Sequence, residues 1–353
     1  MENQWVLVSF RVLRIIVYLS DFTLGHHGWL HWFNSPLSQG GRPNVDVWPD
    51  VSSYSPSELF PVPELKLTTG EQAFLFSSRH PKTVQRHFHW MAEHGVDGAF
   101  LQRFAGQCDV ERGNEGIRRM RDEVGARVRE AAELEGRVFA VMFVIHCSNT
   151  FVPLTHDVLF RYDVSGVPAD RIQRILELDW THLIRNQCIL DSPSYLREKG
   201  KPVIGLWGFG FHNAGHTPEL IRSIVQLFRT MTPKGAYIFG GAPSCWRLSE
   251  GDADRNPGLV DVWLNEFDAV SPWTIGRYKT DREADDFAHT KMKGDVELIK
   301  RRNSDTGRKV DYIPVVLPGG SVSISMSMHA REEVLLIICF SGIQSVGREM
   351  GFQ

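Results

Sequence analysis

Hydrophobic positions along this chain change repeatedly between helical spacing and short continuous runs. Residues 87–95 place apolar side chains at helical spacing and end at Gly95, which suits a helix C-cap. Residues 96–104 follow as a run with the length and composition of a buried strand. That strand ends in Gln102-Arg103, so one amide and one permanent cation would have to be accommodated in a buried segment.

The same pattern recurs to the end of the chain. Amphipathic segments predict helices at 116–135, 168–184, 218–231 and 282–302. Apolar runs predict strands at 138–142, 202–207, 236–241, 267–273 and 311–318. Strands that alternate with helices of this length are parallel and joined by crossovers, and their number favours a (β/α)8 TIM-type barrel. No G-x-G-x-x-G loop follows the first strands, which argues against a dinucleotide-binding sheet.

Composition narrows the class of protein. The chain has 353 residues, is 42% hydrophobic and carries a net charge of -3, which suits a soluble globular α/β protein. This balance favours neither nucleic acid nor a membrane as a partner, and we expect a monomer. Ten tryptophans are present, several beside Gly, Pro or Asp, and their flat faces would suit a sugar. The alternative, that each tryptophan only covers the core, stays open.

Cysteines and histidines give no sign of a metal or disulfide framework. The five cysteines show no CxxC pair and no regular spacing, which predicts free thiols: Cys108, Cys147, Cys188, Cys245 and Cys339. His212 and His216 have metal-like spacing, but Gly215 lies between them and no carboxylate follows in register. We therefore expect no disulfide framework and no zinc site.

The amino-terminal stretch resembles a signal peptide only superficially. Glu2 stands where a positive charge is needed, and Arg11 and Arg14 interrupt the apolar run. The stretch is also too short and too charged to span a membrane. We interpret it as a segment that is not cleaved, which favours a cytoplasmic or non-classically exported protein.

Aromatic and polar side chains gather where the predicted strands end. In a TIM-type barrel the C-terminal strand ends and the loops after them form the active face. The ring of tryptophans, amides and cations there fits a carbohydrate better than a phosphate, which would need a Gly-rich turn at a helix start. The candidate substrate-binding residues are Asp46, Trp48, Gln102, Arg103, Trp207, His212, Trp246, Arg247, Trp273 and Tyr278.

Four motifs in order carry a resemblance to a known family. They are V-D-V-W-P-D-V-S at 45–52, S-S-R-H-P-K-T-V-Q-R-H-F-H-W-M at 77–91, D-G-A-F-L-Q-R-F at 97–104 and S-P-W-T-I-G-R-Y at 271–278. Together they resemble glycoside hydrolase family 99, in its xylosidase/arabinosidase-like branch, which is related to the endo-α-mannosidases. The resemblance implies a single barrel that hydrolyses an α-linked glycan with retention and without a cofactor. It also places Tyr162 and Asp163, in a Tyr-Asp-x-Ser-Gly turn, among the substrate-binding residues.

Three segments depart from the family pattern. Residues 1–27 form an unfamiliar lead, residues 143–161 interrupt the barrel domain 28–319, and residues 320–353 form a tail without the E-x-x-E-G-T-like eighth strand. The run 334–340 has the length and the β-branched content to fill the gap as a substitute strand. We interpret the three segments as translated non-coding sequence in a gene model.

The missing segment decides the expected activity. Glycoside hydrolysis needs two positioned carboxyl groups, and the adjacent Glu332-Glu333 cannot reproduce their spacing. The catalytic residues are therefore unknown. We predict a glycosidase-type barrel that is incomplete and has no turnover as written. The alternative is a barrel that binds glycan without cleaving it, or an inactive gene-model product.

Overall fold

One sheet of mainly parallel strands forms the centre of the molecule. The computed structural model describes residues 13–18, 23–25, 28–30, 49–145, 167–274, 276–278, 280–316 and 337–340. Six parallel pairings join seven strands in a row. In their order across the sheet these are β12 (Asp311–Tyr312), β11 (Ala269–Pro272), β10 (Tyr237–Ala242), β9 (Lys201–Trp207), β7 (Val138–Val144), β6 (Gly98–Phe104) and β1 (Leu13–Tyr18).

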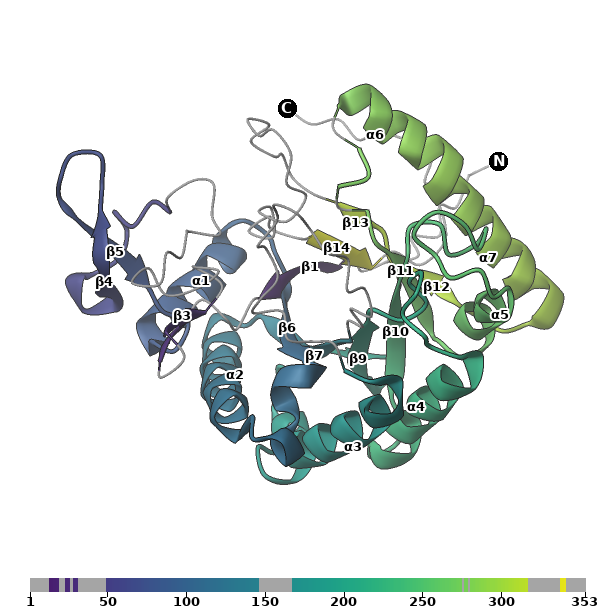
Figure 1. Ribbon diagram of the computed structural model, residues 1–353, viewed down its shortest axis with the longest axis horizontal. Coiled ribbons are helices and arrows are strands. Elements are labelled where there is room, and N and C mark those ends of the chain that lie inside the picture. Colours follow the sequence, from purple (N-terminus) through teal and green to yellow (C-terminus); the bar gives the residue numbers. More distant parts are fainter. Residues whose placement is uncertain are drawn as a thin grey trace, which may run out of the picture.

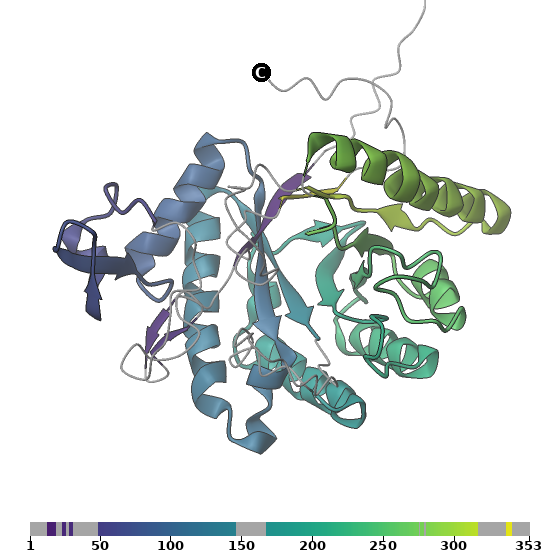
Figure 2. The ribbon, with the colours of Figure 1, turned by 45° about the horizontal axis from the view of Figure 1, so that its top comes forward.

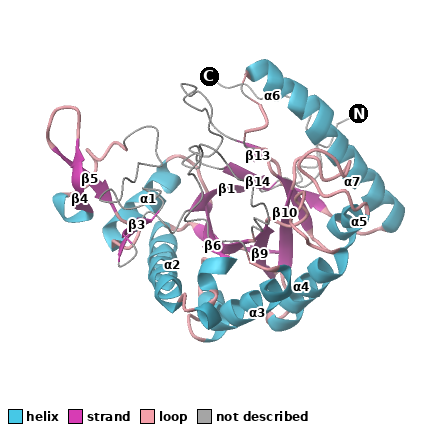
Figure 3. Cartoon of the chain, viewed as in Figure 1, coloured by secondary structure: helices cyan, strands magenta, loops and turns pink. Residues whose placement is uncertain are grey.

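Helices surround this sheet on its outer side (Figures 1 and 3). They are α1 (Pro81–Glu93), α2 (Glu115–Glu135), α3 (Ala169–Arg185), α4 (Pro218–Met231), α5 (Gly258–Asn265), α6 (Asp281–Phe287), the π-helical turn η6 (Ala288–Met292) and α7 (Lys293–Thr306). Short 3-10 turns occupy η2 (Pro56–Glu58), η3 (Ala105–Cys108), η4 (Val110–Arg112) and η5 (Ile189–Asp191). The other strands and helices predicted from periodicity are confirmed, but the strand predicted at 311–318 is divided into β12 and β13 (Val315–Val316), with residues 317–318 outside the described residues. The helix predicted at 282–302 is built from α6, η6 and α7 in succession.

Helix α4 shows how local sequence produces these elements. Thr217 caps the helix by accepting a hydrogen bond from the backbone N–H of Leu220 at 3.2 Å, and Pro218 occupies the first turn, where no donor is lost. Ile221, Ile224, Val225 and Phe228 recur at helical spacing and are fully buried. The apolar stripe therefore packs the helix onto the sheet, while the intervening polar residues face water.

The sheet is strongly curved. Phe100 on β6 and Phe239 on β10 lie three strand spacings apart, which in a flat sheet would separate them by about 14 Å. Their ring centroids are 4.8 Å apart, so both rings lie on the concave face. Strand residues of the opposite parity face the helices: a Cβ on Gly125 of α2 would lie 3.3 Å from Leu101. Because consecutive residues of a strand face opposite sides, this assignment shows which of two neighbouring side chains faces the concave side.

Two strands that are close in the sequence, β12 and β13, stand at opposite ends of the strand order of the whole sheet. β14 (Ile337–Phe340) pairs antiparallel with β1 and with β13 (Val315–Val316), and only Ile313 and Pro314 separate β13 from β12. The structure thus places part of the run 334–340 beside β1, as proposed for a substitute strand. β1 itself belongs to the lead 1–27, so part of that lead contributes to the sheet.

The segment that interrupts the barrel domain begins inside the core. β7 continues past Met142 through Val144, and Phe143 is fully buried against Trp180 of α3 and Phe228 of α4. The rest of the interruption, from residue 146, lies outside the described residues, as does Tyr162. Among the residues described, no helix combines the length and the apolar composition needed to cross a membrane.

A hairpin packs outside the sheet, against the outer side of α1 (Figure 2). It consists of β4 (Leu59–Lys66) and β5 (Gln72–Phe76). The Tyr54 ring stacks on Phe76 at 4.9 Å, and its hydroxyl lies 2.7 Å from Nε2 of His87 on α1. Burial lowers the pKa of His87 to about 4, so this anchor stays neutral at neutral pH.

Three small antiparallel strands complete the elements: β8 (Arg197–Glu198), paired with β9, and the pair β2 (Thr23–Gly25) and β3 (Gly28–Leu30).

Candidate functional site

Three residues at the C-terminal ends of neighbouring strands form the floor of the candidate site. Trp207 of β9 pairs in register with Gly241 of β10, which pairs with Ser271 of β11. A Cβ added to Gly241 would lie 2.0 Å from Cδ2 of Trp207. The indole therefore lies directly over the glycine backbone, on the concave face, and only glycine leaves room for it.

A second tryptophan meets the first at this end of the sheet. The Trp273 ring, just past β11, packs against Trp207 with centroids 5.2 Å apart and planes at 75°. Trp207 is 4% exposed and Trp273 is half-buried. Within the residues that the structure describes, neither Nε1 of Trp207 nor Oγ of Ser271 has a hydrogen-bond partner, although both atoms are buried. The floor of the site thus holds one aromatic corner and two unused polar atoms.

Asp252 ties together the loops that surround these tryptophans. Its Oδ2 accepts hydrogen bonds from the backbone N–H and the hydroxyl of Ser244, at 2.8 and 3.0 Å, and its Oδ1 accepts from the N–H of Cys245 at 3.0 Å. Arg277, from the loop after β11, forms an ion pair with the same carboxylate. The backbone carbonyl of Asp252 accepts from the N–H of His212, in the loop after β9. One aspartate therefore holds three successive loops.

Gln102 and Arg103 lie on opposite faces of β6. Gln102 has the parity of Phe100 and faces inward, half-buried. Arg103 is 1% exposed and faces the helices, where it binds Asp179 of α3 through two hydrogen bonds of 2.7 and 2.8 Å and Asp122 of α2 at 3.0 Å. Burial opposes its charge, but the two carboxylates outweigh that effect and raise the pKa of Arg103. The assignment of Arg103 to the substrate site is corrected: it braces two helices.

Trp246 and Arg247 also have structural positions. Nε1 of Trp246 donates to Asp295 Oδ2 at 3.1 Å, and Nε of Arg247 donates to Oδ1 at 2.9 Å. Trp246 is 2% exposed, and its N–H is already bonded to a residue of α7. Burial raises the pKa of Asp295 to about 6, even though both donors act against that shift. The two residues tie the loop after β10 to α7, which corrects the expectation that Trp246 contacts substrate. The same expectation for the half-buried Arg247 stays a prediction.

The remaining candidates are spread more widely. His212 is exposed in the loop after β9, and the Tyr278 ring lies half-buried 5.6 Å from that of Phe287 on α6. His216 is buried, with its ring against Phe209 at 5.1 Å. Four of the predicted residues lie outside the described residues: Asp46, Trp48, Tyr162 and Asp163. Of the predicted set, the structure brings Trp207 and Trp273 into contact.

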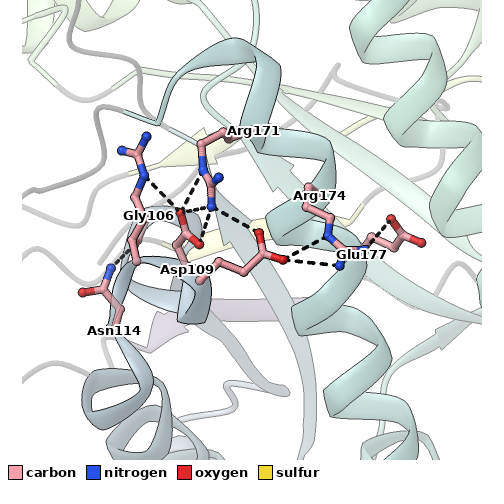
Figure 4. A network of polar contacts seen from close by, with 8 residues as sticks. Gly106, Asp109, Asn114, Arg171, Arg174 and Glu177 are labelled. Carbon is pink, nitrogen blue, oxygen red and sulfur yellow. Dashed lines mark hydrogen bonds and ion pairs between the residues drawn. The ribbon is translucent and has the colours of Figure 1, made fainter.

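Figure 4 shows a polar network that fixes the loop after β6 against the start of α3. Arg171 donates to both oxygens of Asp109, at 2.8 and 2.9 Å, and also pairs with Glu111. Arg174 continues the network from Glu111, and Asn114 closes its other side by donating to the carbonyl of Gly106. Asp109 is 4% exposed and ion-paired, which makes it a structural carboxylate.

Among the described residues, the carboxylates of Asp109 and Asp252 lie near this end of the sheet. Asp109 is buried and Asp252 is half-buried, and both are engaged in ion pairs. In the part of the chain that the structure describes, no three histidine, cysteine or carboxylate side chains are grouped so as to hold a metal ion. Cys108, Cys188 and Cys245 are free thiols.

Sequence reasoning missed Gly241 and Ser271. Both lie inside predicted strands, where nothing in the sequence marks a glycine or a serine as part of a site. Ser271 does precede Trp273 by two residues, so the period of a strand places both side chains on one face. That this face is the concave one follows only from the contact between Phe100 and Phe239, which lie on the same face of the sheet.

No protein-family model matches the chain, and neither does any curated protein sequence. Among solved structures, two of the GH99 endo-α-mannosidase from Bacteroides thetaiotaomicron are similar, with TM-scores of 0.47 and 0.46. Both are 11% identical and cover 86% of this chain, and the matches cover 69% and 71% of theirs. An exo-β-1,4-mannosidase from Opitutaceae bacterium strain TAV5 has a TM-score of 0.32 and 13% identity, with 54% of this chain and 34% of that chain covered. We therefore base the proposal for function on the chain's own residues.

Proposed function

We propose that this chain binds an α-linked glycan at the C-terminal ends of its parallel strands, on a (β/α)8 barrel of the family 99 type, and does not hydrolyse it. The observation that carries the proposal is the corner formed by Trp207 and Trp273 over Gly241. The four motifs quoted from the sequence support the family, and two of them, at 97–104 and 271–278, include strands whose C-terminal ends lie at this end of the sheet.

An aromatic corner suits a sugar because sugar rings present C–H groups on their faces and hydroxyls at their edges. A tryptophan offers an apolar face to the first and an N–H to the second. Trp273 is half-buried, so part of its ring remains accessible. The inward-facing amide of Gln102 adds a polar group on the same face.

The absence of turnover follows from the carboxylates. Retaining hydrolysis requires two carboxyl groups about 5 to 5.5 Å apart, one of which must be free to protonate the leaving oxygen. Asp109 and Asp252 are each engaged in an ion pair with an arginine, Arg171 and Arg277 respectively. The sequence beyond Gly319 contains no E-x-x-E segment.

The test combines a binding titration with a turnover assay. We expect tryptophan fluorescence to report saturable binding of α-linked mannobiose or of methyl α-xyloside or α-arabinoside, and Trp207→Phe and Trp273→Phe to weaken it. Trp180→Phe is the matched control, since that indole is buried between helices and donates to Thr232 at 3.0 Å. Binding that survives both site substitutions would refute the location of the site.

Turnover is measured on aryl α-mannosides, xylosides and arabinosides, beside a version that carries a restored E-x-x-E strand after Gly319. We expect hydrolysis only in the restored version. Hydrolysis by the unmodified chain, lost on substitution of Asp163 or Glu333, would show that the catalytic carboxylates lie in the sequence as it stands.

A further inference from the structure

Nε1 of Trp207 and Oγ of Ser271, the two polar atoms without partners at the floor of the site, belong to residues on the same concave face of the sheet. Trp207 and Ser271 flank Gly241 in adjacent strands, in register, and the indole covers the glycine between them. Ser271 is fully buried and Trp207 is 4% exposed. Both are nevertheless without a hydrogen-bond partner among the described residues.

A buried polar atom without a partner is costly and therefore uncommon in folded proteins. Trp246 and Ser244, near this end of the molecule, do have partners: Trp246 donates to Asp295, and Ser244 donates to Asp252. Nε of Arg277 is also without a partner among the described residues, but the guanidinium of that residue is paired with Asp252. Packing alone would be served as well by alanine at 271, which lacks the hydroxyl. Two such atoms on one surface point to a group that binds from outside the chain.

The residues around Trp207 and Ser271 favour an uncharged ligand group. The concave face next to it is lined by Met142, Gly205 and Phe239, which carry no charge. Arg277 and Asp252, in the loops around the tryptophans, are paired with each other. A carboxylate or phosphate would lose its hydration there without gaining a cation.

The chemistry of the two atoms selects a hydroxyl. The indole N–H only donates, whereas the serine hydroxyl both donates and accepts. A ligand hydroxyl can accept from Nε1 of Trp207 and donate to Oγ of Ser271, so that both protein atoms are satisfied at once. We infer that Trp207 and Ser271 together bind one sugar hydroxyl and make its presence a condition for tight binding at this site.

This inference rests on the proposed function and is tested with methyl α-mannoside and its 2-, 3-, 4- and 6-deoxy analogues, whose dissociation constants are measured by NMR titration. We expect one deoxy analogue to bind the unmodified chain about 5- to 10-fold more weakly than the parent sugar, the loss of one hydrogen-bonded group. Ser271→Ala should bind the parent sugar equally weakly and should no longer distinguish it from that analogue.

Ser192→Ala is the matched control. Ser192 is also a buried serine, but it lies in the connection between α3 and β9, and its hydroxyl donates to Glu133 at 2.6 Å. We expect it to leave all five dissociation constants unchanged.

The outcomes separate the two proposals. If the unmodified chain binds methyl α-mannoside and Trp273→Phe weakens it, but no deoxy analogue binds more weakly, the inference is overturned and the proposed site stands. That comparison uses only the unmodified chain, so it holds even if Ser271→Ala fails to fold. If the unmodified chain binds no glycoside at all, both proposals fall.

Discussion

The sharpest stability prediction concerns Arg103. Its guanidinium is buried between α2 and α3, and it binds Asp179 with two nearly parallel hydrogen bonds of 2.7 and 2.8 Å. Both partners are 1% exposed, so neither can turn to water if the other is removed. Replacing Arg103 by methionine fills a similar volume but leaves the Asp179 carboxylate buried without its cation.

Removing one partner of a buried ion pair typically costs about 3 to 5 kcal/mol. Asp122 also loses its arginine partner in this variant, but it adds little to the cost, because it is 11% exposed and keeps His182 at 2.8 Å. A whole domain is stable by about 5 to 15 kcal/mol, so Arg103→Met should remove a large share of the total. The double variant Arg103→Met with Asp179→Leu removes both charges and should recover most of the loss, to within about 1 kcal/mol.

Urea unfolding followed by circular dichroism measures both free energies of unfolding. Arg127→Met serves as the control: its partner Glu130 is 59% exposed, and such surface pairs contribute less than about 1 kcal/mol. A loss of 1 kcal/mol or less for Arg103→Met, or a double variant no more stable than the single one, would contradict the assignment of Arg103 as a brace.

Three further predictions follow from burial. Gly241→Ala should displace the Trp207 indole, because its Cβ would lie 2.0 Å from the ring; we expect about 1 to 3 kcal/mol of destabilisation in urea and an altered near-UV spectrum, and an unchanged spectrum would contradict it. Burial raises the pKa of Asp295 from 3.8 to about 6, so the folded state binds more protons and the free energy of unfolding should fall as pH rises through this window. Asp295→Asn should lack that slope, and an identical slope in both proteins would refute the assignment. Iodoacetamide at pH 8 should label exposed Cys188 but not Cys108, whose pKa burial raises to about 12; peptide mass spectrometry of the folded chain decides this.

Periodicity in the sequence was sufficient to predict the order of elements. The segment 218–231 predicted a helix and is α4, and the run 202–207 predicted a strand and lies within β9. This succeeds because helix and strand periods are local properties: each depends only on which neighbouring side chains share a face. The tryptophans at the strand ends, Trp207 and Trp273, were found in the same way.

The role of each polar side chain was decided only by tertiary structure. Alternation along β6 shows that Gln102 and Arg103 face opposite ways, but not which of them faces inward. That choice depends on the curvature of the sheet, and the partners of Arg103 lie 19 and 76 residues away along the chain.

The same limit explains the other corrections. Trp246 looked like a rim residue because its partner, Asp295, lies 49 residues further on. Ser271 looked ordinary because a missing hydrogen-bond partner cannot be read from a sequence. The sequence by itself determined which residues stand at the strand ends. Only the three-dimensional arrangement decided which of them are satisfied by distant partners and which have none among the described residues, because hydrogen bonding and burial depend on residues that the chain brings together from far apart.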